Sequence, residues 1–167
     1  MRALVIVESI WGNTDQLARE VAAGLGGDRT EVVDAASAPS AIAPDVDLVV
    51  VAGPTHAFSM STAATRESAR KQGAERIPER GIREWIEAQP SPGRAIPVAT
   101  FDTRVVTPRL PGSAAKKAMK RLIALGFRPL AKPETFGVHG YAGPVADGEL
   151  ERARRWGEGL ARQLPAG

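Results

Sequence analysis

The sequence contains no cysteine and only two histidines, His56 and His139. Without cysteine there is no disulfide, no thiolate zinc site, no iron–sulfur ligand and no thiol nucleophile. With only two histidines, a catalytic metal centre built from several imidazoles is not expected either. We therefore predict no metal site, and any redox chemistry would have to come from a bound group.

Long apolar runs are also lacking. The first run, Leu4–Val7, is four residues long and stops at Glu8, so the N-terminus does not resemble a signal peptide. No other run approaches the roughly 20 residues needed to span a membrane. We expect a soluble, cytoplasmic protein with no membrane partner.

The excess of one charge is small, since 22 Lys and Arg face 19 Asp and Glu and leave a net charge of +3. The basic residues are scattered along the chain, as on the solvated faces of several helices. No nucleic-acid readout motif accompanies them, so we predict no nucleic-acid partner.

The chain has 167 residues, with 17 Gly and 13 Pro. That content stays below the roughly 25–30% typical of low-complexity chains. We see no internal repeat and no linker, and we expect one domain over residues 1–167.

Short apolar runs alternate with amphipathic segments. The expected strands are 3–7, 30–34, 47–53, 95–101 and 134–138. The expected helices are 13–25, 113–125 and 147–164, with Asp147 as N-cap of the last, and two more within 62–88, the second over 78–88. Only a short or irregular link joins the second and third strands. This alternation predicts an α/β fold with a parallel sheet and helices on both faces.

Ligands of doubly wound sheets bind beyond the carboxyl ends of the strands, where loops 8–14, 53–61 and 101–111 are expected. Loop 8–14 opens the first helix, and its backbone N–H groups, hydroxyls and Gly12 favour an anion. Ordinary capping of the helix by Asn13 or Thr14 is the alternative. The Walker spacing and the GxGxxG fingerprint are both absent, which argues against an ATP-type phosphate loop and against a dinucleotide site in this loop.

Ser9-Ile10-Trp11-Gly12-Asn13-Thr14 after a strand resembles the phosphate-binding loop of flavodoxins. The Gly-Pro-Thr-His segment at 53–56 and the Phe-Asp-Thr-Arg segment at 101–104 lie where flavodoxins place their two flavin-ring loops. The resemblance covers nearly the whole chain. It implies a flavodoxin-like, doubly wound five-stranded parallel sheet of order 2-1-3-4-5.

The resemblance also implies FMN as cofactor and a set of residues that contact it. Ser9, Gly12, Asn13 and Thr14 would hold the phosphate, with Ile10 and Trp11 in the same loop. Pro54, Thr55, His56, Ala57 and Phe58 would line one side of the flavin, and Phe101, Asp102, Thr103 and Arg104 the other. Core packing of Phe58 and Phe101, and a surface or ion-paired Arg104, are the alternatives. His56 is the one candidate for a catalytic role, as a donor to a flavin carbonyl or to a quinone, with a purely structural role as its alternative.

Two features depart from the flavodoxin pattern. Trp11 stands where many flavodoxins have Ser or Thr, and the usual Trp/Tyr pair around the ring is missing. Arg104 in a ring loop would stabilise a reduced, anionic flavin. The net positive charge also separates this chain from the acidic electron carriers.

The sequence thus predicts an FMN-binding redox protein that mediates electron transfer with a redox partner protein or a small quinone-like acceptor. Two alternatives stay open: an NAD(P)H-dependent quinone or FMN reductase, and a flavin-free binding or regulatory module. Whether the protein is an enzyme, and whether it forms a homodimer, also stays open.

Overall fold

The computed structural model describes residues 1–165. Seven strands form one sheet: β1 Ala3–Val7, β2 Thr30–Asp34, β3 Leu48–His56, β4 Ser59–Met60, β5 Pro97–Val105, β6 Arg128–Pro129 and β7 Glu134–Val138. The helices are α1 Asn13–Gly24, α2 Ala63–Lys71, α3 Ile82–Ala88, α4 Ala114–Leu125 and α5 Glu149–Gln163, with a 3-10 turn at Gly27–Arg29.

The five long strands lie in the order β2-β1-β3-β5-β7, and all of their pairings are parallel. The short β6 also pairs with β5, so β6 and β7 share the outer position in two pieces. In register, Val5 lies between Val32 and Val50. The predicted order 2-1-3-4-5 is confirmed.

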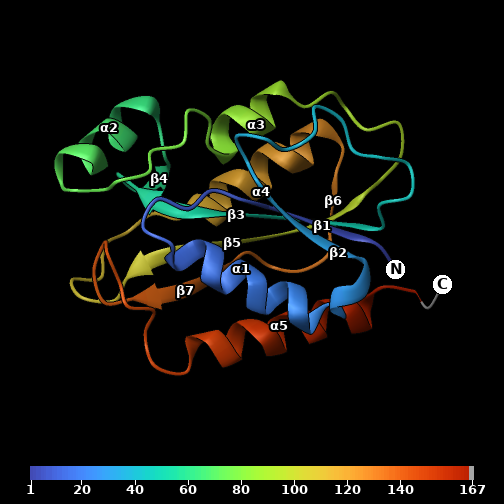
Figure 1. The fold of residues 1–167 in the computed structure, drawn as a ribbon. Helices are drawn as coiled ribbons and strands as arrows, with labels where there is room; N and C mark the ends of the chain where they lie inside the picture. The colour runs from blue at the N-terminus through green and yellow to red at the C-terminus, as the bar shows by residue number, and fades with distance from the viewer. Residues whose placement is uncertain (166–167) are drawn as a thin grey trace.

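Helices cover both faces of this sheet (Figure 1). Alternate residues of β1 point to opposite faces because side chains along a strand alternate. Val5 and Val7 pack in a cluster with α1 and α5, whereas Leu4 and Ile6 pack in a second cluster with α3 and α4. β1 is therefore buried along its whole length, as its continuous apolar run predicts.

The helix ends differ in detail from the sequence prediction. Gly12, in a left-handed conformation with φ +94°, precedes α1, so neither Asn13 nor Thr14 is the N-cap. Gly148 rather than Asp147 is the N-cap of α5. Residues 35–47 contain no helix, which confirms the irregular link between the second and third strands.

Segment 53–61 was expected to be a loop, and most of it is a β-hairpin. β3 continues to His56, Ala57 and Phe58 form the turn, and β4 returns antiparallel, so that His56 pairs with Ser59. Gly53-Pro54 looks like a strand terminator in the sequence. The strand passes through it because β5 continues alongside, pairing Pro54 with Thr103.

Within residues 1–165, no helix combines the length and the apolar character that crossing a bilayer requires.

Candidate functional site

The carboxyl ends of β1, β3 and β5 meet at one edge of the sheet, at the left of Figure 1. A narrow slot of about 40 Å³ lies there, lined by Ile10, Trp11, Asn13, Thr14, Pro54, Thr55, His56, Thr103, Val105, Val138 and Tyr141. The structure thus brings eight of the fifteen predicted cofactor-binding residues together around one opening. Ser9 and Gly12 belong to the same turn as Trp11 but line a neighbouring cleft.

The turn before α1 presents backbone donors to this region. Gly12 is exposed, and nothing lies within 4 Å of the position where a Cβ would be, so the turn is open on that side. Ser9 Oγ accepts the N–H of Asp15 at 3.2 Å. Among the described residues, the N–H groups of Asn13 and Thr14 have no acceptor. Free N–H groups at a helix start, together with the helix dipole, favour an anion.

Two side chains of α1 connect it to other parts of the site. The buried hydroxyls of Thr14 and Thr103 are 2.9 Å apart and form a hydrogen bond that joins α1 to β5. The Asn13 side chain donates to the carbonyl oxygen of Tyr141 at 3.3 Å. The start of α1 is therefore held against β5 and against the segment after β7.

The tip of the β3–β4 hairpin is a strained, apolar turn. Ala57 and Phe58 have φ values of +46° and +68°, in the left-handed region that residues other than glycine seldom adopt. The Phe58 side chain is 53% exposed. Gly112 packs on the Phe58 backbone so closely that a Cβ at 112 would lie 2.3 Å from the Phe58 oxygen.

His56 lies beside the slot at the base of this hairpin. Its Nδ1 is 3.3 Å from the Thr65 hydroxyl at the start of α2. Burial, and then the nearby Arg66 charge, lower the pKa of His56 below its usual value. The ring is therefore neutral at pH 7 and can donate one hydrogen bond and accept another.

Three predicted residues of β5 have side chains that do not line the slot. Phe101 is fully buried, and its ring packs edge-on against Phe136 and Trp156 with centroid distances of 5.3 and 5.9 Å. Asp102 is also fully buried and accepts hydrogen bonds from the hydroxyl of Ser113 at 2.5 Å and from the N–H of Ala115 at 3.0 Å. These two side chains belong to the core and to the start of α4, which corrects the expectation that they face the flavin.

Arg104 is occupied elsewhere as well. Its guanidinium donates to the carbonyl oxygen of Gly112 at 2.7 Å, and its Nε lies 3.9 Å from Asp102 Oδ1. That oxygen has no hydrogen-bond partner among the described residues. Arg104 therefore anchors the 106–112 segment, and it is not the cation beside the slot that the sequence suggests.

Tyr141, Val105 and Val138 also line the slot and were not among the predicted site residues. Tyr141 is 60% exposed and is the only tyrosine of the chain. It lies in a glycine-rich segment after the last strand, at the same edge as the other loops. This position in the sequence could have identified Tyr141 as a site residue, because a lone aromatic residue just beyond a strand end is a candidate for ligand contact.

A buried ionic network supports the site from below. Glu8, at the end of β1, is fully buried and accepts hydrogen bonds from the Ser61 hydroxyl and from the N–H of Ile82, the latter at 2.9 Å. Arg66 donates to the same Ser61 oxygen at 2.8 Å and pairs with Glu84. Burial raises the pKa of the Glu8 carboxyl above its usual value, and the hydrogen bonds and the Arg66 charge offset this only partly. The network joins β1, the end of the hairpin, α2 and α3.

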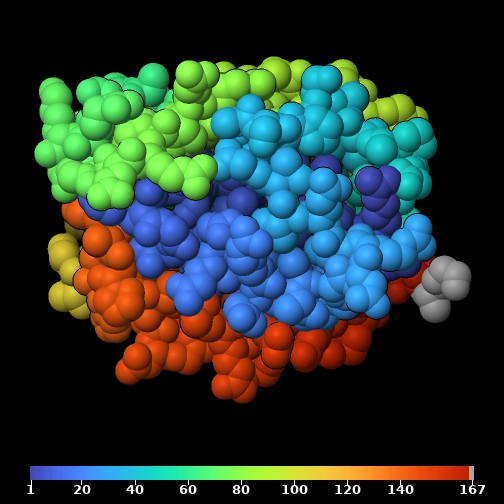
Figure 2. All heavy atoms as spheres, viewed as in Figure 1, coloured from blue at the N-terminus to red at the C-terminus, as the bar shows by residue number. Residues whose placement is uncertain are grey.

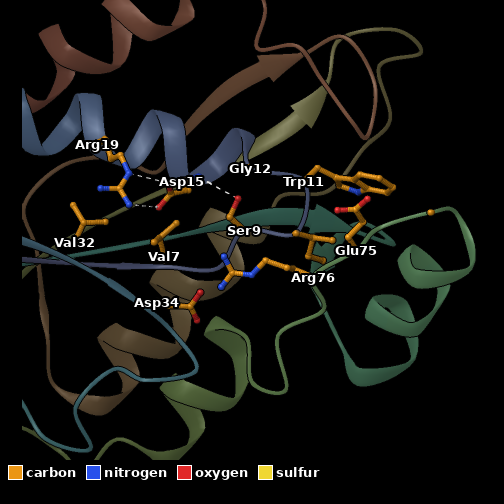
Figure 3. Close-up of a pocket in the computed structure, with 12 residues that line it drawn as sticks. Val7, Ser9, Trp11, Gly12, Asp15, Arg19, Val32, Asp34, Glu75 and Arg76 are labelled. Carbon is orange, nitrogen blue, oxygen red and sulfur yellow. Dashed lines mark hydrogen bonds and ion pairs between the residues drawn. The ribbon is translucent and has the colours of Figure 1, made fainter.

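A larger cleft, of about 610 Å³, lies on the β2 side of the same turn (Figure 3). Its polar lining includes Ser9, Asp15, Arg19, Asp34, Glu75 and Arg76. In Figure 2 the surface is hollowed where the 70–80 segment, the 35–40 segment and α1 meet. Arg19 is paired with Asp15 at 2.9 Å. Within residues 1–165, no three His, Cys, Asp or Glu side chains come together as metal ligands.

No protein-family model and no curated protein sequence matches the chain. Solved structures are similar to it over nearly its whole length. A flavodoxin from the domain Archaea has a TM-score of 0.65 at 16% identity, with 98% of each chain covered. Flavodoxin 1 from Bacillus cereus has 0.70 at 15% identity, covering 99% of this chain and 100% of that one. The flavodoxin of Streptococcus pneumoniae has 0.69 at 15% identity, covering 98% and 100%. The fold is therefore flavodoxin-like, and at these identities the likeness concerns the fold alone.

Proposed function

We propose that this protein binds FMN at the carboxyl edge of its sheet and mediates electron transfer through it. The observation that carries the proposal is the open turn at Ser9–Thr14. The turn has free N–H groups at the start of α1, and it lies beside a slot lined by the turn itself and by the ends of β3, β5 and β7. In a doubly wound sheet, this is where ligands bind.

The turn fits the phosphate end of such a cofactor. The exposed Gly12 leaves open space where a side chain would otherwise stand, and the N–H groups of Asn13 and Thr14 are available as donors. Ser9 adds a hydroxyl. The Thr14 hydroxyl is engaged with Thr103, so it serves to hold the turn against β5. Trp11 contributes a backbone N–H, in place of the hydroxyl that many flavodoxins have at its position.

The slot fits the ring end in its chemistry. Trp11 and Tyr141 supply aromatic faces, and the neutral His56 can donate to a ring carbonyl. Bound FMN would supply the one- or two-electron chemistry that the side chains of this chain lack. With no histidinium and no Arg104 side chain in the slot, the nearest protein groups are uncharged.

The rim of the site fits a partner that approaches the ring edge. Phe58, Leu110 and Tyr141 are each more than half exposed, at 53%, 54% and 60%, and all belong to turns at this end of the molecule. Exposed apolar side chains gathered around an opening are typical of interaction sites. A redox partner protein or a small quinone-like acceptor would meet this surface.

Titration of FMN into the purified protein tests the proposal. We expect a shifted flavin absorption spectrum and quenched flavin fluorescence. Ser9→Ala should weaken the affinity by about 10-fold, since a hydrogen bond to a charged group contributes about 1.5–3 kcal/mol. Ser68→Ala is the matched control, because its hydroxyl bonds within α2 to the carbonyl oxygen of Ala64. Absence of both spectral changes at micromolar FMN would contradict the proposal.

One observation favours the flavin-free alternative, a binding or regulatory module. The slot measures about 40 Å³, whereas sites for small molecules usually measure about 300–1,000 Å³. To admit a flavin the slot must widen, which requires Tyr141 in the 139–145 segment to move away from the end of β3. The same titration decides between the two functions, since a module of this kind would leave the FMN spectrum unchanged.

A further inference from the structure

The larger cleft lies beside the proposed flavin slot, on the other side of the turn at Ser9–Gly12. Its volume of about 610 Å³ falls within the range of about 300–1,000 Å³ typical of small-molecule sites. A second hollow of about 530 Å³ continues it and shares Ser9, Asp34, Glu75 and Arg76. None of the residues of the hairpin or of β5 lines either space.

Asp34 ends β2 and offers one carboxylate oxygen to this cleft. Its Oδ1 accepts the N–H of Ala36 at 2.8 Å, which fixes the side chain. Within residues 1–165, no donor bonds to its Oδ2. Asp34 lines the cleft, and Figure 3 shows its carboxylate below Ser9 in that view.

Arg76 offers the opposite charge. Across residues 1–165, no carboxylate oxygen lies within 4.0 Å of its guanidinium. Figure 3 shows the side chain reaching into the cleft, with its guanidinium between Ser9 and Asp34. A guanidinium is suited to bind a phosphate through two parallel hydrogen bonds. Val7, Val32 and Trp11 add an apolar wall.

We propose that this cleft binds the ribose-phosphate unit of a nucleotide. In doubly wound folds, a carboxylate at the end of the second strand, about 20 residues after the glycine turn, accepts hydrogen bonds from the ribose hydroxyls. Asp34 has that position relative to Gly12. The Arg76 guanidinium takes the phosphate, and the wall at Trp11 packs against the sugar or the base.

The single glycine of the turn determines which part of a nucleotide is bound. Binding both phosphates of a pyrophosphate to the backbone at the start of α1 requires several glycines for close approach, and Ile10 and Trp11 occupy those places. The phosphate is therefore bound by the Arg76 side chain, on the β2 side, and not by the turn. This leaves the N–H groups of Asn13 and Thr14 free for the flavin phosphate.

Calorimetric titration with AMP, in the absence of any flavin, tests this inference. We expect AMP to bind, and Asp34→Asn and Arg76→Gln each to weaken it by about 10-fold. The matched controls Asp28→Asn and Arg80→Gln change exposed side chains outside the cleft and should leave the affinity unchanged.

A ligand that lacks the two ribose hydroxyls distinguishes a hydrogen bond to Asp34 from a non-specific effect of its charge. 2′,3′-dideoxy-AMP should bind the unmodified protein about 10-fold more weakly than AMP. In the Asp34→Asn variant, the two ligands should have the same affinity. Absence of AMP binding at millimolar concentration, or equal affinity for AMP and its dideoxy analogue, would overturn the inference. Because these titrations use no flavin, they can fail while FMN binding succeeds, and the reverse.

The nucleotide can come from two sources with the same chemistry. If it is the AMP half of a flavin dinucleotide, FAD will bind more tightly than FMN, and Arg76→Gln will remove that difference. If it is part of a separate pyridine nucleotide, NADH will bind while FMN is present, and Arg76→Gln will weaken NADH without changing the affinity for FMN. Either result supports the site. Unchanged affinities for FAD and NADH in Arg76→Gln would contradict it.

Discussion

At the scale of single residues, Glu8 is a buried acid under the proposed flavin site. The raised pKa of its carboxyl means that the folded protein holds this proton more tightly than the unfolded chain does. The contribution of Glu8 to stability is therefore greatest below the ordinary carboxyl pKa of 4.5, and it is lost as the pH rises through the higher pKa of the folded protein.

Glu8→Gln removes this titration and keeps an oxygen that can accept from Ile82. We predict that the free energy of unfolding of the variant, relative to that of the unmodified protein, increases as the pH rises from 4 to 8. Urea denaturation at several pH values measures the difference. Glu158→Gln, on the exposed side of α5, is the control and should show no such trend. A constant difference for Glu8→Gln would contradict the raised pKa.

Two residues of β5 show where reasoning from the sequence ends. The sequence predicts a strand that ends at Phe101 and a loop after it, whereas β5 runs over Pro97–Val105 and both Phe101 and Asp102 lie in its middle. β5 is buried on both faces of the sheet, so apolar and polar residues do not alternate along it. The sequence therefore does not indicate toward which face each side chain points. Phe101 lies in the α1–α5 cluster and Asp102 at the start of α4, and only three-dimensional packing decides this.

At the scale of elements, α1 and α5 pack closely through glycine. A Cβ on Gly157 would lie 2.3 Å from the Val21 carbonyl oxygen, and one on Gly24 would lie 2.0 Å from the Arg154 oxygen. Both neighbours are backbone atoms and cannot turn aside. The two helices can approach this closely because neither glycine carries a side chain.

We predict that Gly157→Ala destabilises the protein by about 1–3 kcal/mol, the usual range for overpacking. Gly159→Ala is a matched control on the same helix, since its Cβ would meet only the end of the Arg162 side chain at 3.8 Å. There the better helix propensity of alanine should stabilise by up to about 1 kcal/mol. Denaturant unfolding of both variants gives the comparison, and equal effects would refute the packing argument.

Most of the elements were predictable because buried strands and amphipathic helices leave different patterns. β1, β2 and β7 have the predicted bounds, and α1 and α4 end within one residue of prediction. The hairpin at 56–59 was not predictable, because Ala57 and Phe58 are not residues that favour a turn with positive φ. Its conformation depends on contacts with distant residues, such as Gly112.

At the scale of the whole molecule, ligand binding should stabilise the fold. A ligand at about 100 times its Kd adds about 2.7 kcal/mol, which raises the Tm of a chain of this size by about 5–10 °C. We predict this shift for FMN and a clearly smaller one for riboflavin at the same concentration, since riboflavin lacks the phosphate that the turn at Ser9–Thr14 would hold. Equal shifts would argue against a phosphate site there.

The narrowness of the slot also sets the pace of cofactor capture. The hydrogen bond from Asn13 to the carbonyl oxygen of Tyr141 holds the 139–145 segment beside the slot, so we expect a flavin to enter only after that segment moves away. In stopped-flow mixing, the observed rate of FMN binding should therefore level off with rising FMN concentration, at the rate of opening. Asn13→Ala should raise that plateau. A protein of this design would release its cofactor slowly and would retain it when diluted.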